Sequence, residues 1–204
     1  KLGLGKYLVA EADESDASFL HLQPMIAVVT NIDADHLGSY ENDLGRLKQG
    51  FVEFLHNLPF YGLAVLCSDD DNTRELIPSL GRRVVSYGFG ERADIRVSAV
   101  ERRGLRTSFT VESKERRKPL NVELNLPGRH NVLNSLAAIA VAAELEIGDA
   151  PLLKALADFS GVDRRMQVHG TVTTAAGLVT FVDDYGHHPT ELAATIAAAR
   201  DAWP

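Results

Sequence analysis

The chain has 204 residues, of which 45% are hydrophobic, 24% charged and 7% aromatic. This ordinary globular composition excludes disorder, collagen and coiled coils, and the length fits one large domain or two modest ones. A net charge of −7 argues against a general surface for nucleic acid or for an anionic membrane. The single cysteine, Cys67, favours a reducing compartment such as the cytoplasm, and no apolar run approaches the ~20 residues that span a bilayer.

Strand-like and helical patterns alternate in the first part of the chain. Apolar runs without clean alternation, which are typical of strands buried on both faces, predict strands at 7–10, 25–30, 63–67 and 84–87. Leucine and phenylalanine at spacings of three and four predict an amphipathic helix over 41–58, and a shorter helix is expected at 73–80. This rhythm indicates an α/β fold with a mostly parallel sheet flanked by helices.

The texture then changes to short alternating runs at 95–100, 107–112 and 120–126, which predict a small antiparallel β-meander with one solvated face. Helices are expected at 131–145 and 151–159. A hinge at 161–165 leads to predicted strands at 168–174 and 178–182 and a helix at 189–202.

Acidic residues and a histidine follow two neighbouring predicted strands. Residues 11–16 hold four carboxylates, including Glu11, and residues 30–36 hold Asp33, Asp35 and His36. Ligand sites gather at the carboxyl ends of parallel strands, and carboxylates suit Mg²⁺, so a metal or phosphate site is a hypothesis for this edge. The alternatives are an acidic surface turn that caps a helix and an ordinary surface histidine.

Three further segments carry polar groups at element boundaries. Asn131 and Asn134 lie three apart at a helix start, where they suit a nucleobase edge or a phosphate or serve as an ordinary cap. The Arg164–Arg165 pair suits phosphate recognition or forms a solvated hinge. The turn at 183–191 carries more functional side chains than packing alone would explain, which favours a functional role. These side chains are Asp183, Asp184, Tyr185, His187 and His188.

Five sequence runs, in order along essentially the whole chain, together resemble the Mur ligases, and among these the enzymes that act on L-alanine. The runs are 11–20, 30–36, 56–62, 127–131 and 183–191. The resemblance implies a P-loop-like ATPase domain followed by the beginning of a Rossmann-like α/β domain. It also implies a bacterial cytoplasmic enzyme of peptidoglycan synthesis that uses ATP and Mg²⁺. Its substrates would be UDP-N-acetylmuramate and L-alanine, which are joined through an acyl phosphate.

The resemblance also implies roles for individual residues. Glu11 and His36 look like metal ligands, and Asn131 and Asn134 look like contacts at the ATP site. Arg165 resembles an arginine that reaches the nucleotide phosphates. In the closing domain, Asp184 and His187 resemble residues near the ribose and the reacting end, and Tyr185 and His188 resemble the border of the alanine pocket. The implied catalytic group is His36, Arg165 and His187.

Departures from the family pattern limit what the chain is expected to do alone. No G-x-x-x-x-G-K-[ST] phosphate loop occurs, so residues 1–162 are expected to be a central ATP-binding domain without that loop, and 163–204 the start of a C-terminal domain. The missing portions of the protein would hold the UDP moiety, and the fragment alone is expected to be inactive. Phe51 stands where several sister ligases carry a carbamylated lysine, so no carbamate is expected.

Three rival interpretations remain. A related ligase that recycles a muramate–tripeptide shares much of the pattern, although residues 184–186 and 56–62 favour the alanine enzyme. A metal-dependent hydrolase would use Asp183, Asp184, His187 and His188 around an ion. A non-catalytic binding module would account for the missing phosphate loop.

Overall fold

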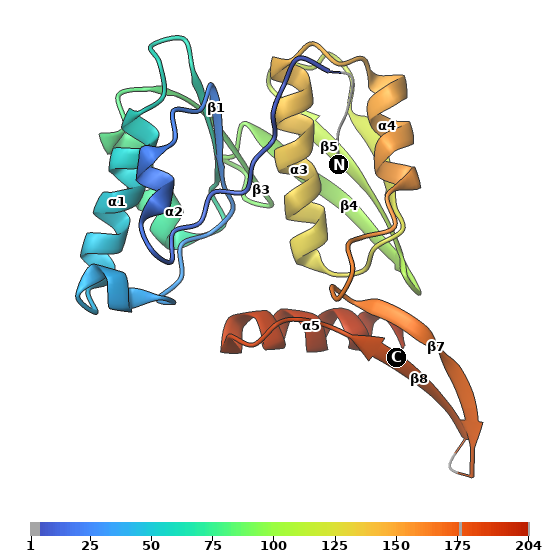
Figure 1. Ribbon diagram of the computed structural model, residues 1–204. Coiled ribbons are helices and arrows are strands. Elements are labelled where there is room, and N and C mark those ends of the chain that lie inside the picture. The colour runs from blue at the N-terminus through green and yellow to red at the C-terminus, as the bar shows by residue number, and fades with distance from the viewer. Residues whose placement is uncertain (1–4, 176, 204) are drawn as a thin grey trace.

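The computed structural model describes residues 5–175 and 177–203, and its main feature is one six-stranded sheet (Figure 1). The strands follow one another in chain order, and the first four pair in parallel while the last two pairings are antiparallel. This confirms the predicted α/β class. The strands are β1 (Ile26–Val29), β2 (Leu63–Cys67), β3 (Arg83–Gly88), β4 (Ile95–Arg103), β5 (Arg106–Ser113) and β6 (Leu120–Leu124).

Strand β2 separates two hydrophobic cores because all five of its residues are buried. Leu63 and Val65 face one core, and Ala64 and Leu66 face the other, as the period of two in a strand requires. This explains why the β2 sequence shows no alternation of apolar and polar residues.

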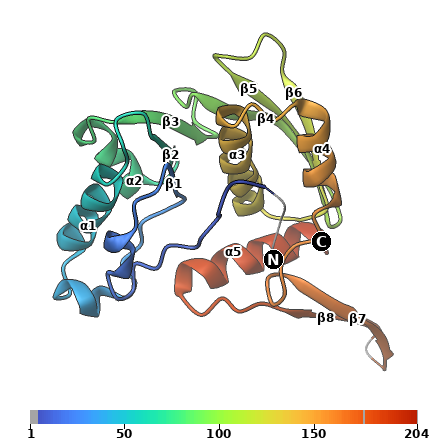
Figure 2. The same cartoon turned by 45° about the horizontal axis from the view of Figure 1, so that its top comes forward.

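Helices cover both faces of the sheet (Figure 2). The first core lies under α3 (Arg129–Glu144) and α4 (Asp149–Asp158). The second lies under α1 (Leu44–His56), which begins at Asp43, whose carboxylate accepts from the backbone N–H of Gly45 at 2.7 Å. Shorter elements complete that side: η1 (Ser18–His21), η2 (Leu37–Tyr40), α2 (Asp71–Leu76) and η3 (Ile77–Ser79).

Two expectations about the strands need correction. The strand predicted at 7–10 is wrong, because the segment has no regular structure and Leu8 and Val9 are 92% and 94% exposed. In the part of the chain that the structure describes, β1 pairs only with β2, so the 7–10 segment has no neighbouring strand to bond. The predicted meander is present, but β4 also pairs with β3 and therefore continues the main sheet.

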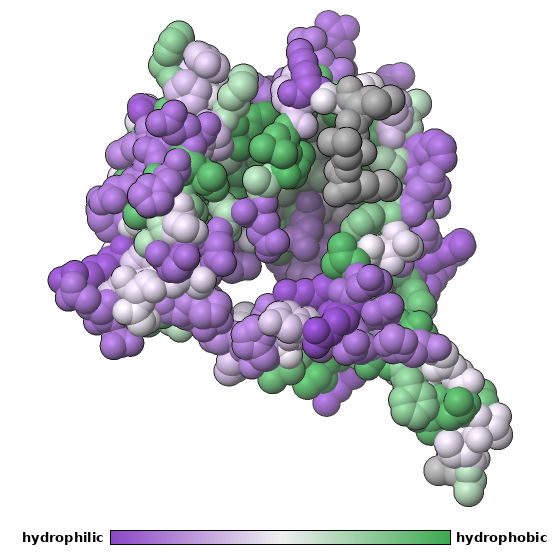
Figure 3. Space-filling model, in the orientation of Figure 1, coloured by the Kyte–Doolittle hydropathy of each residue, from purple (hydrophilic) through white to green (hydrophobic). Residues whose placement is uncertain are grey.

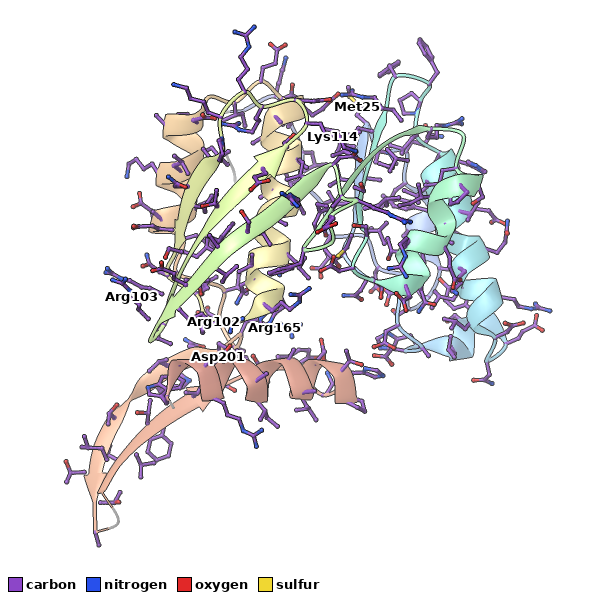
Figure 4. The ribbon with its side chains drawn as sticks, turned by 180° about the vertical axis from the view of Figure 1, so that it is seen from behind. Met25, Arg102, Arg103, Lys114, Arg165 and Asp201 are labelled. Atoms are coloured by element: carbon purple, nitrogen blue, oxygen red, sulfur yellow. The ribbon has the colours of Figure 1, made fainter. Side chains whose placement is uncertain are left out.

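The last part of the chain forms a hairpin and a helix beside the main body: β7 (Gln167–Thr174), β8 (Gly177–Asp183) and α5 (Pro189–Ala202). Helix α5 runs beneath α3 and the end of β4, where Arg102 Nε lies 3.3 Å from Asp201 Oδ2 (Figure 4). Gly128 permits this approach, because a Cβ there would lie 3.0 Å from the Cβ of Ala198.

Apolar side chains remain exposed on the projecting hairpin, among them Val172, Leu178 and Phe181 (Figure 3). Among the described residues, no helix combines the length and the apolar character that crossing a bilayer requires.

Candidate active site

The loops that follow β1 and β2 are tied together at the carboxyl edge of the sheet. Asp70 caps α2 and also accepts from the backbone N–H of Ile32 at 3.2 Å. Asn72 donates to the carbonyl of Ile32 at 2.7 Å. The loop that carries Asp33, Asp35 and His36 therefore starts from a fixed point.

Three side chains from two distant segments of the sequence meet above this edge. One ligand atom each from Asp35, His36 and His187 lies within 4.8 Å of the other two. His36 has a left-handed backbone with φ of 52° and its N–H donates to the carboxylate of Asp35 at 2.8 Å. Its Nδ1 lies 3.5 Å from Glu14 Oε1. The structure thus brings together two predicted site residues, His36 and His187.

A network of backbone hydrogen bonds shapes the turn that carries His187. Asp184 accepts from the N–H groups of Met166 at 2.9 Å and Gly186 at 2.8 Å. Glu191 accepts from the N–H groups of His187 at 3.0 Å and His188 at 3.3 Å. Backbone N–H donors favour the charged carboxylate, and they are the main reason that the pKa of Glu191 lies below its usual value. His188 is the N-cap of α5 and Pro189 follows it, so the dense polar sequence also builds a helix start.

Arg165 lies beside this turn. Its Nη1 is 3.3 Å from Glu191 Oε1, and its guanidinium is 5.8 Å from the centre of the Tyr185 ring. The neighbouring Arg164 lies 4.8 Å from the same ring. Both arginines are exposed, which leaves Arg165 able to exchange its contact with Glu191 for a contact with an anion.

The remaining predicted residues lie around the site. Asn131, in the first turn of α3, donates from its amide to the carbonyl of Pro127 at 2.8 Å, and Asn134 is exposed one turn later. Glu11 is exposed and is not a member of the Asp35–His36–His187 group. Tyr185 is exposed, and His188 is half-buried with its Nδ1 3.5 Å from Asp33 Oδ2.

The sequence reasoning did not assign a role to His130, which is half-buried near Asp184 and Arg165. Burial is the main cause that lowers its pKa, which the charge of Asp184 opposes and the charge of Arg165 reinforces. Asp35 belongs to the loop for which the sequence predicts a metal or phosphate site, but the sequence assigns it no role of its own. Its position directly before His36, in the loop that follows β1, was the available signal.

The ligand atoms of the Asp35–His36–His187 group fit a divalent cation. Asp35 offers a carboxylate oxygen and the two histidines offer imidazole nitrogens, all in reach of one point. Imidazole suits transition metals, and Mg²⁺ prefers oxygen ligands, so Mg²⁺ would need further oxygen atoms such as those of phosphates.

Comparisons with known proteins identify the family of the chain. Residues 5–142 match the Mur ligase middle domain. Over its full 204 residues, the chain is 58% identical to a UDP-N-acetylmuramate--L-alanine ligase from Methylococcus capsulatus, of which the match covers 43%. The crystal structure of UDP-N-acetylmuramate-alanine ligase MurC from Thermotoga maritima matches with a TM-score of 0.77 and 30% identity. The match covers 94% of this chain and 42% of the MurC chain.

A MurF ligase from Thermotoga maritima, solved in complex with ADP, shares the fold at 22% identity and a TM-score of 0.70, over 86% of this chain and 39% of its own. The chain spans about two fifths of the length of the relatives it matches. The match to the middle domain covers well over half of the residues, and it includes the sheet and the loop that bears His36. The chain belongs to the Mur ligase family.

Proposed function

We propose that the chain forms part of an ADP-forming UDP-N-acetylmuramate–L-alanine ligase of peptidoglycan synthesis in the bacterial cytoplasm. The observation that carries this proposal is the 58% identity over the full 204 residues to a ligase of that name. In this proposal, residues 1–162 contribute most of the central ATP-binding domain, and residues 163–204 contribute the start of the C-terminal domain.

The proposed reaction has two steps. The muramate carboxylate attacks the γ-phosphate of ATP, which forms an acyl phosphate and releases ADP. The amine of L-alanine then attacks the acyl carbon, and the resulting tetrahedral intermediate expels phosphate. Phosphoryl transfer depends mainly on positioning and on neutralising negative charge. A site of exposed cationic side chains and metal-binding groups suits these demands better than one built around a nucleophile.

His36 is the residue that we assign most directly to the cation. Asp35 and His187 share its group, and bound Mg²⁺ would neutralise phosphate charge there. Glu11 remains a proposed ligand. In its support, Glu14 of the same acidic segment already lies 3.5 Å from His36.

Arg165 is proposed to bind the phosphates, and its role requires it to leave Glu191. Asn131 and Asn134, at the start of α3, are assigned to the nucleotide. Asp184 and His187 are assigned to the ribose and the reacting end. Each oxygen of Asp184 accepts one backbone N–H, and a carboxylate oxygen has a second lone pair for a ligand hydroxyl. Tyr185 and His188 are proposed to border the alanine pocket.

The test uses the full-length protein that contains this chain. ADP release is measured with ATP, Mg²⁺ and UDP-N-acetylmuramate, and with either L-alanine or a preformed tripeptide as the acceptor. We expect release with L-alanine. Release with the tripeptide alone would identify the recycling ligase instead, and tight metal binding with hydrolysis but no amide product would favour the hydrolase.

Two variants test the residue roles in the same assay. His36→Ala is expected to lower turnover strongly without unfolding the protein, because the residue is exposed on a loop. Arg165→Ala is expected to lower kcat/KM about 100- to 1000-fold if the guanidinium stabilises the transferring group. Lys154→Ala is the matched control, since this exposed lysine of α4 pairs only with Asp158 on the same helix among the contacts described. A change confined to the KM for L-alanine would place Arg165 at the amino-acid pocket.

A further inference from the structure

One hydrogen bond joins the loop after β1 to the start of α5. Thr190 Oγ1 donates to Asp33 Oδ2 at 2.6 Å across 157 positions of sequence. His188 Nδ1 lies 3.5 Å from the same oxygen. Asp33 Oδ1 accepts from the N–H of Ala34 at 2.8 Å, so the two oxygens of this carboxylate serve different partners.

Both ends of this contact are held in place. Asp33 directly follows Ile32, which is buried and whose backbone is bonded by Asp70 and Asn72. On the other side, Thr190 lies in the first turn of α5, which begins with a capping box between His188 and Glu191. Because both residues are held by their own segments, the bond fixes the position of the first turn of α5 relative to the loop after β1. A bond between two mobile side chains would not do this.

The same two segments supply the metal-binding group. Asp35 and His36 lie two and three residues after Asp33, and His187 lies three residues before Thr190. The bond between Asp33 and Thr190 therefore joins the two segments that supply the group.

We propose that Asp33 is a positioning residue: by accepting the hydroxyl of Thr190, it holds the turn before α5 so that His187 stands against Asp35 and His36. Asp33 itself need not contact substrate. This inference rests on the proposed function, because it assigns Asp33 a part in assembling that site.

The first experiment measures steady-state ADP release by the full-length enzyme. Asp33→Ala and Thr190→Val are each expected to lower kcat at least tenfold and to leave the KM for ATP within twofold. Asp33→Asn keeps an acceptor oxygen and Thr190→Ser keeps a hydroxyl, so both are expected to retain kcat within about threefold. Thr110→Val is the matched control, since Thr110 makes an exposed bond to Asn121 on the far strands β5 and β6.

The double variant Asp33→Ala/Thr190→Val separates a shared role from two independent ones. We expect it to be no slower than the slower single variant, because both changes remove the same bond. Effects that multiply would overturn the proposal, as would Asp33→Asn being as slow as Asp33→Ala, since a charge effect would then explain the loss.

Hydrogen exchange gives a readout that does not depend on activity. Amides at 184–192 are expected to exchange at least tenfold faster in Asp33→Ala and Thr190→Val than in wild type, and at the wild-type rate in Asp33→Asn. Unchanged exchange in both alanine and valine variants would contradict the proposal. If the wild-type enzyme releases no ADP with L-alanine, the proposed function fails, and the exchange result still decides whether Asp33 holds the turn.

Discussion

Replacing Gly88 with alanine tests how closely β3 packs against Asp69. A Cβ at Gly88 would lie 2.2 Å from Asp69 Oδ1 and 2.9 Å from its Cγ, whereas ordinary contacts begin near 3.4 Å. The carboxylate would have to move by about 1 Å. It could not do so freely, because it accepts from the N–H of Phe89 at 2.9 Å and of Gly90 at 3.2 Å and pairs with Arg129 Nη2 at 2.5 Å.

The size of the effect follows from the bonds at risk. A hydrogen bond to a charged group contributes about 1.5–3 kcal/mol, so losing the two bonds that Asp69 Oδ1 accepts would cost about 3–6 kcal/mol. Alanine returns about 0.5–1 kcal/mol by restricting the unfolded chain. We therefore expect Gly88→Ala to lower the free energy of unfolding by about 2–5 kcal/mol, which corresponds to a fall in Tm of about 4–20 °C for a chain of this size.

Thermal unfolding followed by circular dichroism measures this shift, with Gly90→Ala as the matched control. A Cβ at Gly90 would lie 3.8 Å from the same oxygen, an ordinary contact, so the control should only gain the roughly 0.5–1 kcal/mol that alanine returns by restricting the unfolded chain. Adding Gly88→Ala to Asp69→Ala should have little further effect, because the obstructing carboxylate is gone. Equal Tm values for the two glycine variants would refute the steric argument.

Three smaller predictions concern the core, a helix cap and pH. Leu66→Ala should lower the free energy of unfolding by about 2–5 kcal/mol in urea titrations, because Leu66 is fully buried in β2. Asp43→Ala should lower it by about 1 kcal/mol in the same assay by removing the cap of α1. His130→Gln should flatten the pH dependence of Tm below pH 6.5. Burial lowers the pKa of His130 in the folded state, so the unfolded chain binds the proton first as the pH falls. The wild type therefore loses stability as the pH falls below 6.5, and the variant lacks this loss. A pH profile for His130→Gln that parallels the wild type would show that another group is responsible.

Local pattern was enough to predict most elements of the fold. The bounds predicted for β2 and α5 agree with the structure, because an unbroken apolar run and a proline-initiated helix are local signals. The segment 7–10 has the same apolar pattern as β2 and yet forms no strand. A strand is stabilised by its neighbours, and the pattern of a segment does not reveal whether a neighbour is present.

The candidate site was predictable in its parts and less so in its assembly. His36 and His187 were both selected from the sequence, and the structure places them in one group. The sequence places Asp33 in the candidate metal or phosphate loop, but it does not predict the bond to Thr190, which lies 157 positions away. The carboxylate of Asp184, selected for a ligand, also organises its own turn. Periodicity describes what a segment forms, but it does not report which distant side chain completes a hydrogen bond.

The contacts of α5 limit how the end of the chain can move. Thr190, Ala198 and Asp201 lie on one side of this helix and meet three separate places on the main body: Asp33, Gly128 and Arg102. The opposite side of α5, with Ile196, Ala199 and Trp203, faces β8 across a shallow groove. Sliding or tilting α5 would break at least one of these contacts, and rotation about the helix axis would carry Thr190 away from Asp33 and Asp201 away from Arg102.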